Sequence, residues 1–335
     1  MTSTLSATTT TSQLLAETLA EEATRDPRVV VLGEDVGGLG GVFGVTRRLQ
    51  RELGSDRVLD TPISETAFVG LAIGAAQAGL VPVVELMFVD FLGVCFDQIM
   101  NQMAKNTYMS GGRQAVPLTL RTAVGCIGAA AQHSQVLSAT FAHIPGLKVV
   151  FPSSPGDACG LLRAAVRDPN PVVLLEHKWL IKSRVDAIPW TDDLDQRGEV
   201  AEIGKLRVLR PGADVAIVGA GWVVQHAWSA ADLLATRGIA ASVVDLRTLV
   251  PLDRDGLVDV AGKSRTLLVV DDDYRDFGVS AEVIATVAER MGPAAPRMAR
   301  LAPDVPIPAS KVLEQALLPD PVSIAEAAEA LAAAS

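Results

Sequence analysis

A lone carboxylate, Glu65, stands where an extended stretch gives way to an apolar helix. Pro62 disfavours helical backbone at the residue before it, and Ser64 is placed to cap a helix that begins at Glu65. Phe68 and Val69 follow, so the sequence predicts a partly desolvated carboxylate whose ionised form is disfavoured. Such a group can hold a proton for acid–base chemistry. The alternative is a structural role, in which the carboxylate only complements the helix dipole.

A histidine, His133, stands among hydrogen-bonding side chains in the run 131–135, after a glycine-containing stretch at 125–128. Imidazole titrates near neutral pH and so suits proton transfer, although a single histidine in such a setting is more often structural. The sequence has no Gly-x-Ser-x-Gly turn for a serine hydrolase and no His-Glu-x-x-His pattern for a transition metal. His133 is therefore a candidate for proton transfer.

A Gly-x-Gly turn in the second half of the chain suggests dinucleotide binding. Gly219 and Gly221 follow an apolar run, and Asp245 ends the next one, about where a ribose-binding acid would lie. The third glycine of that fingerprint is missing, because Val224 stands there behind the bulky Trp222. The pattern favours an ordinary tight turn, and an NAD-dependent oxidoreductase remains an alternative.

Two other polar segments each follow a predicted strand. The loop 33–41 is rich in glycine but lacks the Gly-Lys-Ser/Thr ending of a P-loop, which excludes phosphate binding of that kind. A flexible loop and a closely packed one both stay open. The cluster Asp271-Asp272-Asp273 ends a strand, and we expect it to be a solvated entrance to a loop.

The strands and helices that must position these groups alternate along the chain. Its 335 residues are enough for two domains. Short β-branched runs separate helical stretches of small residues, which predicts two α/β domains with parallel sheets. In the first half we expect strands at 29–32, 81–88, 118–122, 148–151 and 172–176, and helices at 12–25, 65–78, 93–109 and 155–167. In the second half we expect strands at 215–218, 241–245, 267–271 and 298–301.

The predicted boundaries follow changes in composition. The Thr/Ser-rich start favours a disordered tail at 1–11, and mixed charge with Pro189 and Trp190 favours a connection at 186–212. The two domains are then expected at 12–185 and 213–335.

Composition limits the classes of partner. The formal net charge is −10, so nucleic acid and anionic membrane surfaces are not expected partners. Cys95, Cys126 and Cys159 are far apart, which favours packing roles in a reducing compartment. The N-terminus resembles neither a signal peptide nor a transit peptide, and polar residues and a proline interrupt the longest apolar run, 67–87. We expect a cytoplasmic protein that does not enter a membrane.

Seven collinear stretches carry a resemblance to a known family. They are 31–36, 60–65, 96–99, 131–135, 143–150, 170–173 and 304–308. Together they resemble the beta subunit of the thiamine-diphosphate-dependent first component of 2-oxo acid dehydrogenase complexes, in the transketolase-like superfamily. The resemblance implies a transketolase-like pyrimidine-binding α/β domain followed by a transketolase C-terminal-like domain.

The resemblance also implies roles for four side chains. Glu65 matches the acid that hydrogen-bonds the aminopyrimidine ring of thiamine diphosphate and so activates the cofactor. Met87 and Phe91 match residues that pack around the pyrimidine. His133 matches a histidine that assists proton transfer, or steadies the carbonyl substrate and the incoming lipoyl group. The implied reaction cleaves a small carbonyl substrate and passes the acyl unit to lipoamide on an acyltransferase core.

Two metal ions are implied by the same resemblance. Family members hold a structural potassium ion, largely through backbone carbonyls, at positions that match Val116, Leu118, Thr119, Ala165, Asp168 and Asn170. Thiamine enzymes hold the diphosphate through Mg²⁺ at a Gly-Asp-Gly motif with a downstream asparagine, and here the nearest candidate is Asp255-Gly256 without that partner. An alpha subunit is therefore expected to supply that half of the site, in a heterotetramer of two alpha and two beta chains.

The resemblance specifies the substrate less closely than the cofactor. Stretches 85–93 and 175–178 look most like the acetoin dehydrogenase branch, which favours acetoin or a short 2-oxo acid such as pyruvate. One alternative is a branched-chain 2-oxo acid dehydrogenase beta subunit. Another is a non-catalytic scaffold subunit, against which the intact Glu65 and His133 argue.

Overall fold

Runs of valine and leucine form the strands of a first sheet. Its strands are β1 (Val29–Gly33), β2 (Val58–Asp60), β3 (Val81–Leu86), β4 (Thr119–Val124), β5 (Lys148–Val150), β6 (Val172–His177) and β10 (Thr248–Val250). They lie in the order β10-β5-β6-β4-β3-β1-β2, and only β10 is antiparallel to its neighbour. β1, β3, β4 and β6 are buried at every position, as expected for parallel strands between helical layers. The computed structural model describes residues 9–190 and 198–333.

Local signals set the starts of several helices around this sheet. A capping box between Thr10 and Gln13 begins α1, and Ser154 accepts a hydrogen bond from the Asp157 amide at the start of α6. The helices are α1 (Thr11–Arg25), α2 (Leu49–Leu53), α3 (Glu65–Gln77), α4 (Ala104–Met109), α5 (Ser138–Ala142), α6 (Pro155–Arg167) and α7 (Lys178–Lys182). A 3₁₀ segment η1 (Val89–Gly93) and a π-helical segment η2 (Gln98–Met103) precede α4, where a single helix at 93–109 was predicted.

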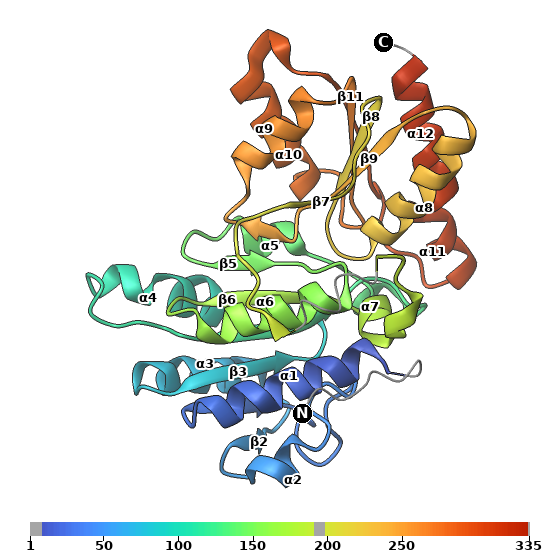
Figure 1. Ribbon diagram of the computed structural model, residues 1–335. Coiled ribbons are helices and arrows are strands. Elements are labelled where there is room, and N and C mark those ends of the chain that lie inside the picture. Colours follow the sequence, from blue (N-terminus) through green and yellow to red (C-terminus); the bar gives the residue numbers. More distant parts are fainter. Residues whose placement is uncertain (1–8, 191–197, 334–335) are drawn as a thin grey trace.

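A second sheet follows the same plan. Its strands are β7 (Arg207–Arg210), β8 (Val215–Gly219), β9 (Ala241–Asp245), β11 (Thr266–Val270) and β12 (Arg297–Leu301), in the order β12-β11-β8-β9-β7. Its helices are α8 (Val223–Thr236), α9 (Arg254–Gly262), α10 (Val279–Met291), α11 (Lys311–Leu317) and α12 (Pro321–Ala333). Figure 1 shows α8 and α12 on one face of the sheet and α9 and α10 on the other.

The predicted fold class is confirmed, because both units are α/β with sheets that are parallel except at one edge. The short edge strands β2, β7 and β10 were not predicted. β7 lies inside the stretch 186–212 that was expected to be a connection, and it pairs with β9 of the second sheet. β10 extends the first sheet by pairing with β5, so the two units share a sheet edge.

Parts of the predicted boundaries cannot be compared with the structure. Residues 1–8 of the expected tail and residues 191–197 of the expected connection lie outside the described residues. Helix α1 begins at Thr11, inside the expected tail. The division into domains at these boundaries stays a prediction.

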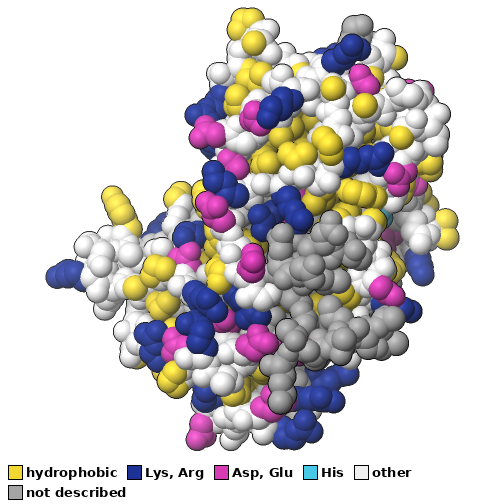
Figure 2. Space-filling model, viewed as in Figure 1, with side chains coloured by type: hydrophobic (Ala, Val, Ile, Leu, Met, Phe, Trp, Pro, Cys, Tyr) yellow, Lys and Arg dark blue, Asp and Glu magenta, His cyan; other side chains and the backbone are white. Residues whose placement is uncertain are grey.

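The surface and the helix lengths bear on possible partners. Within residues 9–190 and 198–333, no helix is long and apolar enough to cross a membrane. On the face drawn in Figure 2, basic and acidic side chains are interspersed, and no broad surface of one sign gathers there. Such a surface offers little attraction to a phosphate backbone.

Candidate active site

The carboxyl ends of parallel strands meet at one edge of the first sheet, and candidate site residues follow several of them. Glu34 follows β1, Met87 follows β3 and Lys178 follows β6. This edge faces the second unit, because Asp272, after β11, pairs with His177 at the end of β6. In α/β folds this is the edge at which ligands usually bind.

Glu65 is the first residue of α3, as predicted, and only 8% of it is exposed. Ser64 occupies the N-cap position, but its side chain makes no capping hydrogen bond. Its backbone amide instead donates to the carboxylate of Glu34. Burial, together with the charges of Glu65 and Asp35, raises the pKa of Glu34, and its Oε1 atom has no partner among the described residues. Two neighbouring buried carboxyl groups do not readily ionise together, so this pair suits the holding of a proton.

His133 is held by aromatic packing. Its ring centroid lies 5.0 Å from that of Phe88 and 5.7 Å from that of Phe91, and both contacts are edge-on. Phe88 also contacts Phe43, with centroids 5.7 Å apart. Edge-on aromatic pairs of this kind fix ring orientation and contribute about 0.5–1.5 kcal/mol each beyond area burial. His133 is only half-buried, so its imidazole is oriented and still accessible.

Charged side chains from three elements hold the segment 125–135, which carries His133. Lys178, at the start of α7, donates from Nζ to backbone carbonyls at both ends of the stretch 125–133. Asp90 of η1 and Glu314 of α11 accept backbone N–H groups of the segment. The position of His133 is therefore set by long-range contacts as well as by local structure.

Gly125 is required where this segment leaves β4. Its φ is +88°, a region that residues with a side chain rarely adopt. A Cβ atom there would lie 2.1 Å from Nε2 of His177. The absence of a side chain lets the backbone turn past His177 and into the segment that carries His133.

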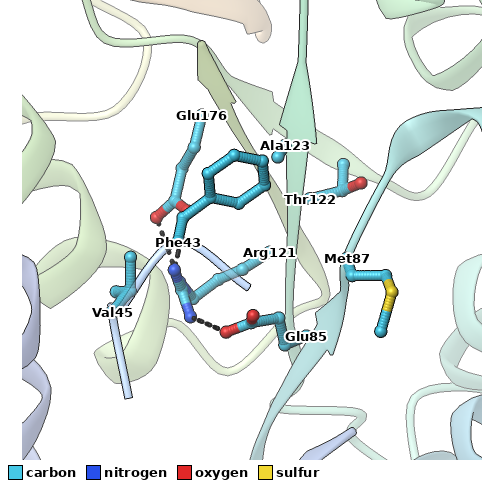
Figure 3. Close-up of a pocket in the computed structure, with 8 residues that line it drawn as sticks. All are labelled: Phe43, Val45, Glu85, Met87, Arg121, Thr122, Ala123 and Glu176. Atoms are coloured by element: carbon cyan, nitrogen blue, oxygen red, sulfur yellow. Dashed lines mark hydrogen bonds and ion pairs between the residues drawn. The ribbon is translucent and has the colours of Figure 1, made fainter. Parts of the chain in front are cut away.

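A buried ion-pair network lies beside Met87. Arg121 donates to Glu85 at 3.0 Å and to Glu176 at 3.0 and 2.6 Å. Figure 3 shows Arg121 reaching between the two carboxylates, with Met87 and Val45 on opposite sides of it. Burial, and the nearby charge of Glu176, raise the pKa of Glu85. The charged groups of Arg121, Glu85 and Glu176 are hydrogen-bonded to one another, so the network is structural and does not itself offer free groups to a ligand.

The predicted solvated entrance at 271–273 is wrong for two of its three residues. Asp272 and Asp273 are 7% and 4% exposed. Asp272 pairs with His177 at 3.0 Å, and Asp273 accepts the Ser138 hydroxyl at 2.8 Å. The reason is the contact between the units: β11 ends against the first sheet, so its acidic residues find partners there instead of water.

Other parts of the chain occupy the space next to the Gly-x-Gly turn. A Cβ atom at Gly221 would lie 2.3 Å from the ring of Phe151, and the Gly221 amide donates to the Phe151 carbonyl at 3.3 Å. Asp245 is fully buried, accepts the Ser153 hydroxyl, and has its pKa raised to about 7 by burial and the charge of Asp157. Neither the turn nor the acid is open to a dinucleotide in this arrangement.

The six predicted potassium positions lie at the start of β4, the end of α6 and the turn into β6. The carbonyls of Val116, Leu118 and Ala165 each accept one backbone amide. The Asp168 carboxylate forms an ion pair with Lys148 and accepts hydrogen bonds from the backbone amide and the side chain of Asn170. A carbonyl oxygen has a second lone pair, so backbone ligation remains open at these positions.

Of the predicted site residues, the structure brings Phe91 and His133 into contact. Phe88 packs against both of them, and Met87 is the residue before Phe88. Glu65 lies near the end of η1, because Thr66, the next residue of α3, donates to the carbonyl of Val94 directly after η1. No ring contact or hydrogen bond among the described residues joins Glu65 to His133.

Sequence reasoning missed four residues of this site: Glu34, Phe88, Asp90 and Lys178. All but Glu34 fall inside the stretches 85–93 and 175–178, whose likeness to one branch of a family was the available signal. Glu34 stands in the glycine-rich loop, where the Gly37 and Gly38 amides donate to Asp60, although Leu39 farther along the loop is 70% exposed.

Comparisons with known proteins identify the two units. Residues 7–183 match the family "Transketolase, pyrimidine binding domain", and residues 204–324 match "Transketolase, C-terminal domain". The chain is 45% identical to the acetoin:2,6-dichlorophenolindophenol oxidoreductase subunit beta of Cupriavidus necator, over 93% of this chain and 94% of that one. It is 40% identical to the 2-oxoisovalerate dehydrogenase subunit beta of Bacillus subtilis, over 94% of this chain and 95% of that one.

Solved structures show the same fold. A split-gene transketolase, described as an inactive beta4 tetramer, superimposes with a TM-score of 0.79 at 22% identity, covering 96% of this chain and 98% of that one. At that identity the likeness shows the fold alone. The sequence matches over both units show that the chain belongs to the transketolase-like family of dehydrogenase beta subunits that includes the acetoin, pyruvate and 2-oxoisovalerate enzymes.

Proposed function

We propose that this chain is the beta subunit of a heteromeric, thiamine-diphosphate-dependent enzyme that cleaves acetoin or a short 2-oxo acid and passes the acyl unit to lipoamide. The observation that carries the proposal is the buried Glu65 at the start of α3, beside Glu34, within a unit that matches a pyrimidine-binding domain. The names of the relatives favour acetoin over pyruvate and branched-chain substrates, because the two acetoin subunits reach 45% and 41% identity and the others 39–40%.

The residues present fit the pyrimidine half of such a cofactor. Glu34 has a buried carboxylate oxygen without a partner among the described residues, and Glu65 beside it is poised to share a proton. Met87 and Phe91 supply apolar surface on the same edge of the sheet. Bound thiamine diphosphate supplies a nucleophilic carbon that adds to the substrate carbonyl.

In this arrangement Glu65 holds a proton at the aminopyrimidine nitrogen. Its carboxyl group lies beside that of Glu34, whose pKa is raised by burial and by the charge of Glu65, so the two groups can keep one proton between them for the ring nitrogen. His133, oriented by Phe88 and Phe91, holds or transfers a proton at the substrate oxygen and steadies the arriving lipoyl group.

The diphosphate half of the cofactor site is assigned to an alpha subunit. Among the described residues, no group of His, Cys, Asp and Glu side chains could hold a metal ion. The chain also exposes apolar side chains on and next to α3: Leu71 of the helix is 58% exposed, Ile63 before it 85%, and Val94, whose carbonyl accepts the Thr66 hydroxyl, 55%. Exposed apolar surface of this kind marks a site of protein association. The surface lies next to Glu65, so an alpha subunit that covers it completes the pocket.

The test is co-expression of the chain with its alpha subunit. We expect reduction of dichlorophenolindophenol, and of lipoamide when the acyltransferase core is added, to depend on both thiamine diphosphate and a carbonyl substrate. A panel of acetoin, pyruvate and a branched-chain 2-oxo acid identifies the substrate. Full activity of the chain by itself, or a heteromer that binds no thiamine diphosphate, would contradict the proposal; the second result is what a non-catalytic scaffold would give.

A structural potassium ion is part of the same proposal. It would be held by backbone carbonyls at the positions that lie between β4, α6 and β6, where free lone pairs remain. An ion that binds only the folded chain raises the melting temperature. We expect a higher melting temperature in potassium chloride than in tetramethylammonium chloride at equal ionic strength, and equal values would exclude the ion.

A further inference from the structure

We propose that Lys178 is a positioning residue for the reaction, which holds His133 in place by clamping both ends of the backbone stretch that carries it. The inference rests on the proposed function, because it concerns the same site. Lys178 is the first residue of α7, directly after β6. Its side chain therefore enters the site from the strand next to β4, and reaches the segment that leaves β4.

The contacts of Lys178 are specific. Its Nζ donates to the carbonyl oxygen of Gly125 at 2.9 Å and to that of His133 at 2.6 Å. The third direction of the ammonium group faces the ring of Phe88, whose centroid lies 5.2 Å away. Phe88 in turn packs on the imidazole of His133. One side chain thus contacts the backbone of His133 and the ring that orients its side chain.

The charge of Lys178 is unusual for a purely structural clamp. The residue is fully buried, and no carboxylate of the described residues lies within ion-pair distance of its Nζ. Burying an ammonium group without a paired carboxylate is costly, and a neutral amide could donate to the same carbonyls at lower cost. A charged donor makes hydrogen bonds about twice as strong as a neutral one, which holds the stretch more firmly.

Other contacts hold the residues after His133, because the Gly125 amide donates to the Gln135 carbonyl at 2.9 Å and Cys126 Sγ to the Ser134 carbonyl at 3.2 Å. Among the described residues, the hydrogen bond to the His133 carbonyl comes from Lys178. Glu314 accepts the Gly128 amide at 2.9 and 3.1 Å, and Asp90 accepts the Gln135 amide at 3.3 Å. Neither contact reaches His133 itself, whose own amide donates only within the turn, to the Ala130 carbonyl at 3.3 Å. Loss of the Lys178 bonds would free the backbone at the histidine.

The charged groups around Lys178 come from three elements. Burial lowers the pKa of Lys178 to about 8, and the positive charge of Lys182 acts in the same direction. The negative charges of Asp90 and Glu314 act in the opposite direction and raise it. Cys126 also faces it, but burial raises the pKa of that thiol to about 12, so it is neutral when Lys178 titrates. Above pH 8 the clamp loses its charge, and its hydrogen bonds weaken.

Hydrogen exchange of the heteromer tests the clamp without any substrate. We compare wild type with Lys178→Met, Lys178→Arg and the control Lys263→Met, which removes the lysine that follows α9 and whose side chain is 71% exposed. We measure the protection of the amides in 125–135, corrected for the intrinsic pH dependence of exchange. In wild type it should be at least fivefold lower at pH 9 than at pH 7. At pH 7 it should be at least fivefold lower in Lys178→Met than in wild type. In Lys178→Arg, which keeps its charge, protection should not change with pH. If Lys178→Met does not fold, the wild-type pH series decides.

Steady-state kinetics of the same heteromers test the consequence. A histidine displaced by about 1 Å can lose about 100-fold in rate. Lys178→Met should lower kcat at least tenfold, with KM for the carbonyl substrate and thiamine diphosphate affinity within threefold of wild type. Lys178→Arg should recover most of kcat and lack the alkaline decline above pH 8. Wild-type kcat in Lys178→Met, or unchanged protection of 125–135 across pH in wild type, overturns the proposal. An inactive wild-type heteromer with the predicted exchange pattern instead overturns the proposed function.

Discussion

At the scale of single residues, buried charge gathers where the two units meet. Asp271, itself half-buried beside the buried Asp272 and Asp273, illustrates the consequence, because desolvation and the charges of Asp273 and Asp272 raise its pKa to about 8. The unfolded chain releases this proton near the ordinary value of 3.8, while the folded chain keeps it until about pH 8. The group therefore contributes stability that is fully present below pH 3.8 and is lost as the pH rises through this window.

Asp271→Asn removes that titration while keeping a side-chain oxygen for the Asp273 amide, which Asp271 now accepts at 3.0 Å. We expect the free energy of unfolding of the variant, relative to wild type, to rise between pH 5 and pH 8.5. Urea unfolding at both pH values measures it. A difference between variant and wild type that is the same at the two pH values would show that Asp271 does not titrate as described.

The residues found from the sequence and those missed differ in a physical way. Glu65 and His133 each sit in a local pattern, a helix start and a run of hydrogen-bonding residues, which one can read without the fold. Glu34 gains its role only from burial beside Glu65, and Lys178 only from carbonyls 45 and 53 residues away in the chain. Contacts over such separations are set by the strand order, which a single sequence does not reveal.

At the scale of elements, the central strands and the main helices were predictable because burial on both faces gives them continuous apolar runs. The edge strands β2, β7 and β10 have three or four residues each, too short for a pattern to stand out. The interruption by η2 was also unpredictable, since a π-helical turn has the composition of an ordinary helix.

The turn from β4 into the His133 segment gives an element-scale prediction. Gly125→Ala places a Cβ atom 2.1 Å from His177 in a left-handed conformation, whereas Gly111→Ala meets a φ of +64° with nothing within 4 Å. The control should lose about 1–2 kcal/mol of unfolding free energy, from backbone strain alone. Gly125→Ala should lose clearly more, as measured by urea unfolding, and equal losses would mean that the turn moves freely away from His177.

At the scale of the whole molecule, the two units are joined through a shared sheet edge, and apolar side chains on and next to α3 stay exposed. β10 of the second half completes the first sheet, and the buried pair of His177 and Asp272 joins the strand ends. The exposed surface along α3 then stands out, since its apolar residues contact nothing within the chain that would cover them.

Leu71→Asp tests whether that surface binds the alpha subunit. The charge should abolish the heteromer while the chain keeps its circular dichroism and unfolding midpoint, because Leu71 is already 58% exposed. Val322→Asp, at a 50% exposed residue of α12, is the matched control and should assemble normally. Light scattering of the co-purified chains measures assembly. Wild-type assembly of Leu71→Asp would place the partner elsewhere.

The most direct test of the proposed function is the turnover of a Glu65→Gln heteromer at saturating thiamine diphosphate. Glutamine keeps the size of the side chain but cannot exchange a proton with the cofactor. We expect carbonyl-dependent reduction of the acceptor to fall by about 10²–10⁴-fold, the usual contribution of a positioned acid–base group, with the heteromer still assembled. Turnover within a few-fold of wild type would contradict the central claim that this chain contributes the proton-holding half of a shared thiamine site.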